Sequence, residues 1–201
     1  MEADSNISGK DSVKNDAPLR LAVVGFSASG KDTAADYLVS RYGFEHISSS
    51  DIIRSYISEH GLGRATREVM QSVGRKLRAD NGPDYLVVVA LSRGGQRLVV
   101  SGLRAVEEAI RFKEAGGKII AVEAPIDARY KRVVERGDID SKMPFEKFKE
   151  FEEAETSSTD PTGQNLAEVI SLADYKIESG TTVEKLYAEI DRVLSEISRL
   201  I

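Results

Sequence analysis

The sequence predicts an α/β fold in which helices cover both faces of a parallel β-sheet. Two observations support this. Short apolar runs alternate with helical patterns along the chain, and its 201 residues suit one compact domain. The expected strands are residues 21–24, 44–47, 97–100, 118–123 and 174–177, and the expected helices are residues 31–42, 51–59, 106–115, 127–135 and 183–200. Strands that alternate with helices in this way pair in parallel.

The first strand and helix show the pattern most clearly. Residues 21–24 read Leu-Ala-Val-Val and end at Gly25, which is typical of a strand buried on both faces. The helix over 31–42 then carries Ala34, Ala35, Leu38 and Val39 at helical spacing. The chain therefore begins its fold with a strand, a glycine-rich turn and a helix.

Composition narrows the function classes. Hydrophobic residues make up 41% and charged residues 30% of the chain, which is enough to build a core. The formal net charge of −5 argues against general binding of nucleic acid or acidic membranes. There is no Cys and no apolar run of about 20 residues, so we expect a cytoplasmic protein. The sequence leaves monomer and homodimer both open.

Three stretches depart from the alternating pattern. Residues 1–18 are polar and are expected to be a disordered tail before a single domain over 19–201. Residues 66–92, broken at Gly82-Pro83, and residues 136–172, broken at Pro144 and Asp160-Pro161, form two charged insertions. Both follow strands at the edge where ligands bind in α/β sheets, so we expect them to be mobile flaps.

The turn after the first strand fits the phosphate-loop pattern GxxxxGK, from Gly25 to Lys31. Glycines let the backbone N–H groups point at phosphates, the helix N-terminus favours negative charge, and Lys31 reaches the transferring group. The sequence therefore predicts ATP binding. The predicted ATP-binding residues are Gly25, Ser27, Ala28, Ser29, Gly30, Lys31, Asp32 and Thr33.

The residues after the lysine raise a question about Mg²⁺. The usual hydroxyl arrives one position late, at Thr33, because Asp32 follows Lys31. A carboxylate at Asp32 suits Mg²⁺, which prefers oxygen ligands, so Asp32 and Thr33 are candidate metal residues. Asp32 is equally well explained as an acid in the first turn of a helix.

The loop and the order of elements over about residues 20–200 resemble the nucleoside monophosphate kinases of the P-loop superfamily, whose loop ends GKxT. The resemblance implies a three-layer α/β/α fold with five parallel strands in the order 2-3-1-4-5. It also implies that residues 51–95 form an acceptor-binding insertion and residues 136–165 a lid over ATP.

Two further motifs carry the resemblance. Residues 48–54, SSSDIIR, are similar to the family segment STGDMLR, which implies that Ser49 and Arg54 bind the acceptor phosphate. Asp51 is a helix cap or a metal residue in this segment. Residues 99–104, VVSGLR, are similar to the DGFPR stretch, which assigns Arg104 to the acceptor. Here Ser101 replaces the family's acidic residue.

The helix over 127–135 resembles the helix that enters the lid. Arg132 and Arg136 lie four residues apart on one face, so the resemblance places both over ATP. Arg129 is expected at the surface. A lid without Cys or clustered metal ligands implies no zinc.

Residues 65–75 are similar to the TPRELLQxLG segment of phage-type deoxynucleoside monophosphate kinases, and the layout also resembles an archaeal group of adenylate- or dephospho-coenzyme-A-kinase-like proteins. Arg67 and Gln71 would then read the acceptor from one helix face. Alternatively, Arg67, Arg75 and Arg78 only solvate a helix.

Together, these motifs imply ATP- and Mg²⁺-dependent phosphoryl transfer to a nucleoside or deoxynucleoside monophosphate, a small-molecule nucleotide acceptor. Lys31, Arg104, Arg132 and Arg136 are the expected catalytic residues. Two alternatives stay open, a dephospho-coenzyme A kinase and a nucleotide-switched P-loop ATPase. A monophosphate acceptor is favoured because its phosphate oxygen is already nucleophilic and needs no general base.

Overall fold

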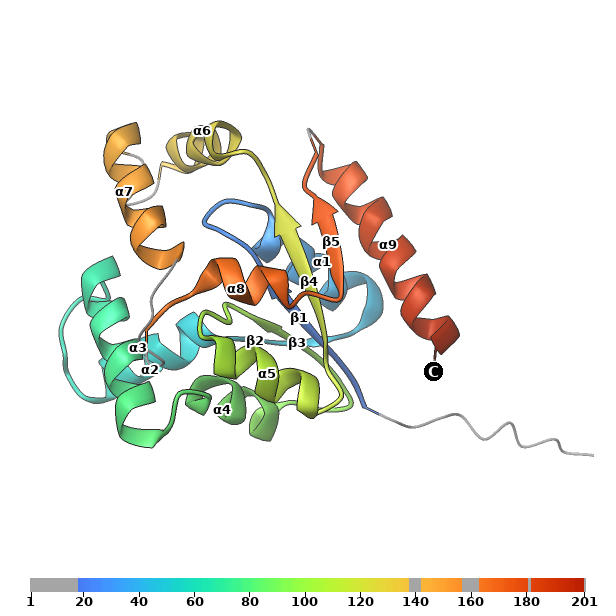
Figure 1. Cartoon of the computed structure of the whole chain (residues 1–201), viewed down its shortest axis with the longest axis horizontal. Helices are drawn as coiled ribbons and strands as arrows, with labels where there is room; N and C mark the ends of the chain where they lie inside the picture. Colours follow the sequence, from blue (N-terminus) through green and yellow to red (C-terminus); the bar gives the residue numbers. More distant parts are fainter. Residues whose placement is uncertain (1–17, 138–141, 157–162, 181, 201) are drawn as a thin grey trace, which may run out of the picture.

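The computed structural model describes residues 18–137, 142–156, 163–180 and 182–200 (Figure 1). Apart from Pro18, the expected tail lies outside the described residues, as does the Asp160-Pro161 break in the second insertion. The described helices are α1 Lys31–Tyr42, α2 Ser49–Glu59, α3 Arg67–Asn81, α4 Tyr85–Arg93, α5 Val106–Glu114, α6 Ile126–Arg136, α7 Phe145–Thr156, α8 Leu166–Ser171 and α9 Val183–Leu200.

A five-stranded parallel sheet forms the centre of the molecule. Its strands are β1 Leu19–Val24, β2 Glu45–Ser48, β3 Arg97–Ser101, β4 Lys118–Glu123 and β5 Tyr175–Glu178. They are arranged in the order β2-β3-β1-β4-β5, which confirms the predicted order. In the middle strand, Ala22 lies opposite Val100 of β3 and Ile119 of β4. The carboxyl end of β1, where the glycine-rich turn begins, therefore lies at the centre of the sheet.

Helices pack on both faces of this sheet, and the alternation of side chains along β1 feeds both layers. Leu21 and Val23 pack in a core cluster with α1 and α9. Ala22 and Val24 pack on the opposite face, in a cluster with α2, α3, α4, α5 and α8. Every side chain from 21 to 24 is at most 1% exposed, because successive residues of a strand point to opposite faces and both faces are covered.

The two insertions are only partly separate from this core. The apolar run in α4 is buried, with Leu86, Val87 and Ala90 each 0% exposed, and Leu166 of α8 is 1% exposed. The expectation that the whole of each insertion is a mobile flap is therefore wrong for α4 and α8, because their apolar faces complete the core. The elements that stand farther from the sheet are α3 in the first insertion and α7 in the second (Figure 1).

Helices α6 and α7 have a small buried core of their own. Val133 of α6, Phe148 of α7 and Ala28 of the glycine-rich turn form a separate buried cluster. This cluster joins α6 and α7 to the turn that follows β1.

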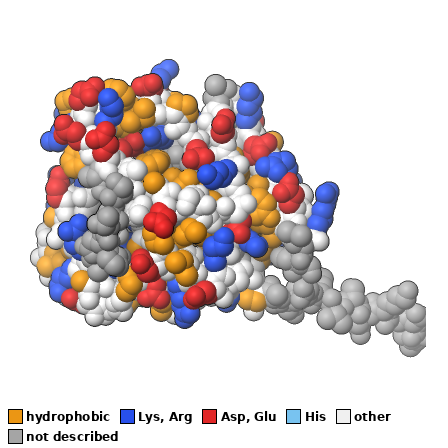
Figure 2. All heavy atoms as spheres, in the orientation of Figure 1, with side chains coloured by type: hydrophobic (Ala, Val, Ile, Leu, Met, Phe, Trp, Pro, Cys, Tyr) orange, Lys and Arg blue, Asp and Glu red, His pale blue; other side chains and the backbone are white. Residues whose placement is uncertain are grey.

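The surface gives two further observations. On the face shown in Figure 2, acidic and basic side chains are interspersed and form no continuous basic band. None of the described helices combines the length and apolar character needed to cross a bilayer.

Candidate active site

The turn between β1 and α1 has the backbone geometry of a phosphate loop. Gly25 has φ 152°, Ala28 has φ 56° and Gly30 has φ 106°, so three of its residues lie at positive φ. A side chain at Gly25 would collide with the carbonyl oxygen of Val122 on β4 and come within 2.5 Å of Ser29 Oγ. This close wrap is available only to glycine, and it makes a concave backbone surface of the kind that binds anions.

The side chains of the loop also fit an anionic ligand. The hydroxyl of Ser29 is buried and has no hydrogen-bond partner among the described residues. The Lys31 side chain is 13% exposed and lies 3.3 Å from the Asp32 carboxylate. Burial lowers the pKa of Lys31, and the positive charges of Arg104 and Arg136 lower it further. A phosphate would partner the buried groups and relieve the repulsion among these three cations.

The structure brings all the predicted acceptor residues together. Ser49, Arg54, Arg67, Gln71 and Arg104 line one cavity of about 390 Å³, and Ser27 of the phosphate loop lines it too. Four arginines line this cavity, and no Asp, Glu or His is among its described lining residues. We call it the acceptor cavity. Its chemistry is that of an anion site beside the phosphate loop.

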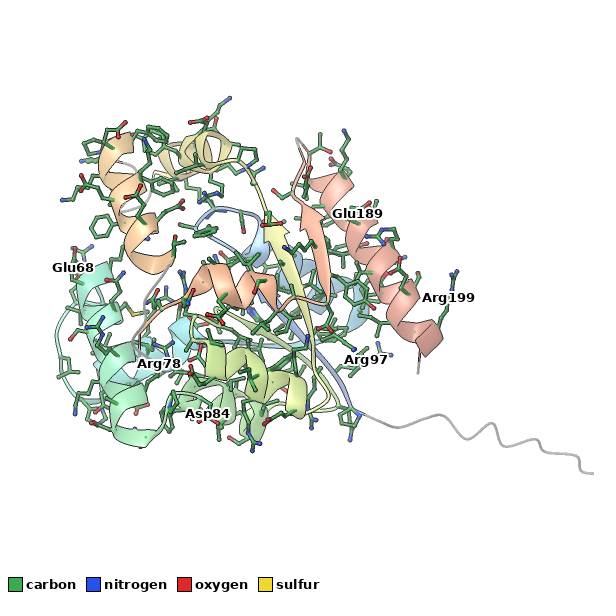
Figure 3. All side chains as sticks on the ribbon, viewed as in Figure 1. Glu68, Arg78, Asp84, Arg97, Glu189 and Arg199 are labelled. Atoms are coloured by element: carbon green, nitrogen blue, oxygen red, sulfur yellow. The ribbon has the colours of Figure 1, made fainter. Side chains whose placement is uncertain are left out.

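Two cavity residues were missed or misread from sequence. Arg78, on α3, is 3% exposed and lines the cavity (Figure 3), which contradicts the alternative in which it only solvates a helix. Gln164, which precedes α8, lines it too. A signal for Arg78 was present, because Arg67, Gln71, Gly74 and Arg78 follow helical spacing along one face of α3 and all four line the cavity.

The start of α2 differs from the expected capping. Ser48 is the N-cap, since its side chain accepts a hydrogen bond from the backbone N–H of Ser50 at 3.2 Å. The Asp51 carboxylate, which the sequence left as a cap or a metal residue, accepts a hydrogen bond from Arg54 at 2.7 Å. Both side chains are more than half exposed. Asp51 is therefore paired with Arg54, which lines the acceptor cavity.

The position where the family carries an acid is occupied by a hydroxyl with another partner. Ser101, at the end of β3, is 2% exposed, and its Oγ lies 2.8 Å from His46 Nε2. The Ser101 hydroxyl is therefore hydrogen-bonded to a side chain of the sheet itself. A neutral hydroxyl at Ser101 does not supply the negative charge that a carboxylate would offer to Mg²⁺.

The first turn of α1 supplies the remaining candidate metal residues. Asp32 is exposed and Thr33 is half-buried. Among the described residues, no three acidic, His or Cys side chains form a metal cluster. Mg²⁺ in phosphoryl-transfer sites commonly takes only one or two protein ligands and completes its shell with phosphate oxygens and water. One carboxylate and one hydroxyl at the end of the phosphate loop fit that requirement.

On the side of the phosphate loop away from the acceptor cavity, Arg132 of α6 binds backbone and side-chain oxygens. Its Nη1 donates to the carbonyls of Ala28 at 3.0 Å and Ser29 at 3.2 Å, and to Ser179 Oγ at 2.8 Å. Its Nη2 donates to the carbonyl of Gly180 at 3.2 Å. Arg132 thus ties α6 to the phosphate loop and to the segment after β5.

Arg136, one turn further along α6, remains exposed at the end of the same helix face. It lines a cavity of about 240 Å³ together with Gly30 and Thr33 of the loop. The two arginines predicted over ATP therefore both lie beside the loop, on α6. A neighbouring cavity of about 570 Å³ is lined by Arg132, Ser179 and Gly180.

Arg129 is buried, contrary to the expectation that it lies at the surface. It is 6% exposed and forms an ion pair with Glu152 of α7. Its Nε donates to the Ala124 carbonyl at 2.9 Å, and its guanidinium lies 5.0 Å from the ring centroid of Phe26 in the phosphate loop. The inward face of α6 packs against the loop and α7, which removes Arg129 from solvent.

Comparison with known proteins agrees with this fold. Residues 21–157 match a protein family described as an AAA domain. The chain is 31% identical to the UPF0200 protein of Methanosarcina barkeri, over 89% of this chain and 96% of that protein. This chain belongs to the UPF0200 family. A second relative, the UPF0200/UPF0201 protein of Archaeoglobus fulgidus, is 30% identical over 89% of this chain and 56% of its own length.

Solved structures extend the comparison beyond the UPF0200 family. Shikimate kinase from Bacteroides thetaiotaomicron has a TM-score of 0.62 at 11% identity, over 90% of this chain and 99% of that one. The protein TT1252 from Thermus thermophilus has a TM-score of 0.61 at 22% identity, over 90% and 98%. This member of the UPF0200 family therefore has a P-loop kinase-like fold.

Proposed function

We propose that this protein transfers the terminal phosphoryl group of ATP to a small acceptor that itself carries a phosphate, foremost a nucleoside or deoxynucleoside monophosphate. The acceptor cavity carries this proposal. It adjoins the phosphate loop through Ser27, and four arginines but no carboxylate or imidazole are among its described lining residues.

The absence of a base in this described lining favours a phosphate as the nucleophile. A hydroxyl acceptor gains from a general base that removes its proton in the transition state. A phosphate oxygen is already anionic at neutral pH and needs only to be held in line. Guanidinium groups suit that task because they donate two parallel hydrogen bonds to one phosphate.

The transfer step follows from these positions. An oxygen of the acceptor phosphate forms a bond to the γ-phosphorus. The bond from that phosphorus to the β,γ-bridging oxygen breaks, and this oxygen keeps the electron pair in ADP. The positive charges of Arg104, which lines the acceptor cavity, and of Arg136 on α6 both lower the pKa of Lys31. Lys31, Arg104 and Arg136 can therefore stabilise the charge that is spread over the transferring oxygens.

The other loop and lid residues hold the reactants. The backbone from Gly25 to Gly30 receives the phosphates, and Arg132 fixes that backbone through the carbonyls of Ala28 and Ser29. Asp32 and Thr33 are the residues that would hold Mg²⁺, which neutralises phosphate charge when bound. The buried cluster between α6, α7 and the loop excludes water from this side.

A coupled assay for ADP release tests the function. Purified protein is incubated with ATP, Mg²⁺ and, one at a time, the common nucleoside and deoxynucleoside monophosphates and dephospho-coenzyme A. We expect ADP release that depends on one or a few of the monophosphates, with the diphosphate product identified by chromatography.

Two other outcomes would contradict the proposal. ADP release with dephospho-coenzyme A alone would assign a hydroxyl acceptor and require a base supplied from outside the described lining. Slow ADP release that no acceptor stimulates would assign a nucleotide-switched ATPase. Either result rejects transfer to a monophosphate.

A further inference from the structure

A buried carboxylate joins two walls of the acceptor cavity. Glu108, in the first turn of α5, is 0% exposed. Its Oε1 accepts a hydrogen bond from Arg78 Nε at 2.9 Å. Its Oε2 accepts from the backbone N–H groups of Arg104 at 2.8 Å and Ala105 at 3.1 Å. Both oxygens are thus occupied, so this buried charge is fully partnered.

Glu108 holds two cationic residues of the cavity by different means. It binds the guanidinium of Arg78, which comes from α3, and it fixes the backbone that carries Arg104 after β3. Arg78 and Arg104 both line the acceptor cavity. Arg78 reaches Glu108 through Nε, and the planar guanidinium carries two further Nη groups that can donate to one ligand.

Separate polar groups in the same cavity indicate that a ligand belongs there. Ser49 is 2% exposed, and its Oγ has no hydrogen-bond partner among the described residues. The Oε1 of Gln164 is buried without a described partner as well. Buried polar atoms are rarely left unpaired, because each costs about 1–3 kcal/mol when it loses water without gaining a partner.

We propose that Arg78 binds the acceptor's phosphate directly, together with Arg104, and that Glu108 is the positioning residue that sets the geometry of both. The inference rests on the proposed function in taking this cavity as the acceptor site. Glu108 neutralises one of the clustered cations while it directs the Arg78 guanidinium, so the cavity gains directional donors without a further net charge. The ligand recognised in this way is a phosphate dianion.

Two variants test the proposal. Arg78→Lys keeps the positive charge but loses the planar guanidinium, which can donate to Glu108 through Nε and to a ligand through its Nη groups. The double variant Arg78→Met with Glu108→Gln leaves no unpaired buried charge and keeps an oxygen that can accept the Arg104 N–H. Both are expected to raise the acceptor KM by about 10- to 100-fold and to leave the ATP KM within about twofold.

A control on the same helix separates this effect from general damage to α3. Asp80 pairs with Lys76 at 2.5 Å, and both side chains are more than half exposed. Asp80→Asn is expected to leave both KM values unchanged. If Arg78 and Glu108 only support the fold, the melting temperature falls while the acceptor and ATP KM values stay as in the wild type, and the proposal is rejected.

A binding measurement covers the case in which no acceptor supports turnover. With ADP saturating the phosphate loop, inorganic phosphate is titrated in a thermal-shift experiment. Phosphate is expected to stabilise the wild type and Asp80→Asn but to lose at least about tenfold in apparent affinity with Arg78→Lys and the double variant. Equal stabilisation of all four proteins overturns the role of Arg78, whereas a failed turnover assay alone overturns only the proposed function.

Discussion

The Lys31 side chain is 13% exposed, and its pKa lies below the ordinary value of a lysine. Burial lowers its pKa, and Arg104 and Arg136 lower it further, although Asp32 partly opposes them. Because the folded protein holds this proton less firmly than the unfolded chain, the charged lysine costs stability at neutral pH. That cost is relieved as the pH rises through the lowered pKa.

Lys31→Met should therefore stabilise the ligand-free protein and disable it. We expect the melting temperature to rise by about 2–4 °C for each kcal/mol of relieved repulsion, and turnover to fall about 100- to 1,000-fold. Thermal denaturation and the ADP-release assay measure the two effects. Lys131→Met, at a side chain that is 77% exposed on α6, is the control and should change neither. Unchanged turnover in Lys31→Met would exclude the loop from the site.

A substitution at Gly25 tests the close approach of the phosphate loop to the backbone of β4. Gly25→Ala combines a positive φ with a collision against the Val122 carbonyl, which belongs to a central strand and cannot move aside. We expect a loss of more than about 3 kcal/mol in the free energy of unfolding, together with loss of ATP binding.

The matched control for that variant is Gly43→Ala. Gly43 ends α1 with φ 69°, and a side chain there would meet nothing within 4 Å. It should cost only the backbone strain, about 1–2 kcal/mol. Urea unfolding compares the two variants, and equal losses would show that the collision at Gly25 is relieved by movement of the loop.

At the scale of elements, α6 and α7 are tied to the phosphate loop by buried charge. Arg129 of α6 contacts the ring of Phe26 in the loop and pairs with Glu152 of α7, whose side chain is 6% exposed. Arg129 therefore joins α6 and α7 to the loop through one buried polar contact and one ring contact.

Removing one member of this pair should destabilise the protein strongly. Glu152→Ala leaves the Arg129 charge buried without its carboxylate and is expected to lower the free energy of unfolding by about 3–5 kcal/mol. The control is Glu146→Ala on the same helix, where the pair with Lys149 is exposed and should contribute less than about 1 kcal/mol. Urea denaturation measures the free energy of unfolding of both variants. Similar losses would show that the buried Arg129–Glu152 pair contributes no more than the exposed pair.

At the scale of the whole molecule, the two halves of the site lie on either side of the phosphate loop. The acceptor cavity is built from α2, α3 and the segment after β3, whereas the lid side is built from α6 and the segment after β5. The parallel sheet holds the loop between them, because β1 is its central strand. We therefore expect any closure over the ligands to come from the helices that surround the sheet.

Hydrogen–deuterium exchange tests this division. A dinucleotide that links adenosine to an acceptor nucleoside through a chain of phosphates should protect peptides from both α2–α3 and α6. ADP alone should protect only the loop and α6. The buried strands β1 and β4 serve as internal controls and should exchange slowly throughout. Protection by the dinucleotide that matches ADP alone would contradict binding in the acceptor cavity.

Much of the architecture was predictable because it depends on local patterns. The apolar runs and their order predicted the parallel sheet. The spacing of Arg67 and Gln71 predicted that both lie on one face of a helix. The prediction of two whole flaps was wrong because α4 and α8 are short apolar helices within charged insertions. Only their contacts with α5 and the sheet show that they belong to the core.

By itself, the sequence determined the phosphate loop from Gly25 to Thr33, because an anion-binding turn is built from consecutive residues and needs no distant partner. The tertiary structure alone decided the state of Arg78 and Arg129. Their partners Glu108 and Glu152 lie 30 and 23 residues away in the chain, and helix periodicity gives no sign of such pairs. Spacing on α3 shows that Arg78 shares a helix face with Arg67 and Gln71, but only the packing of other elements buries an arginine and fixes its partner.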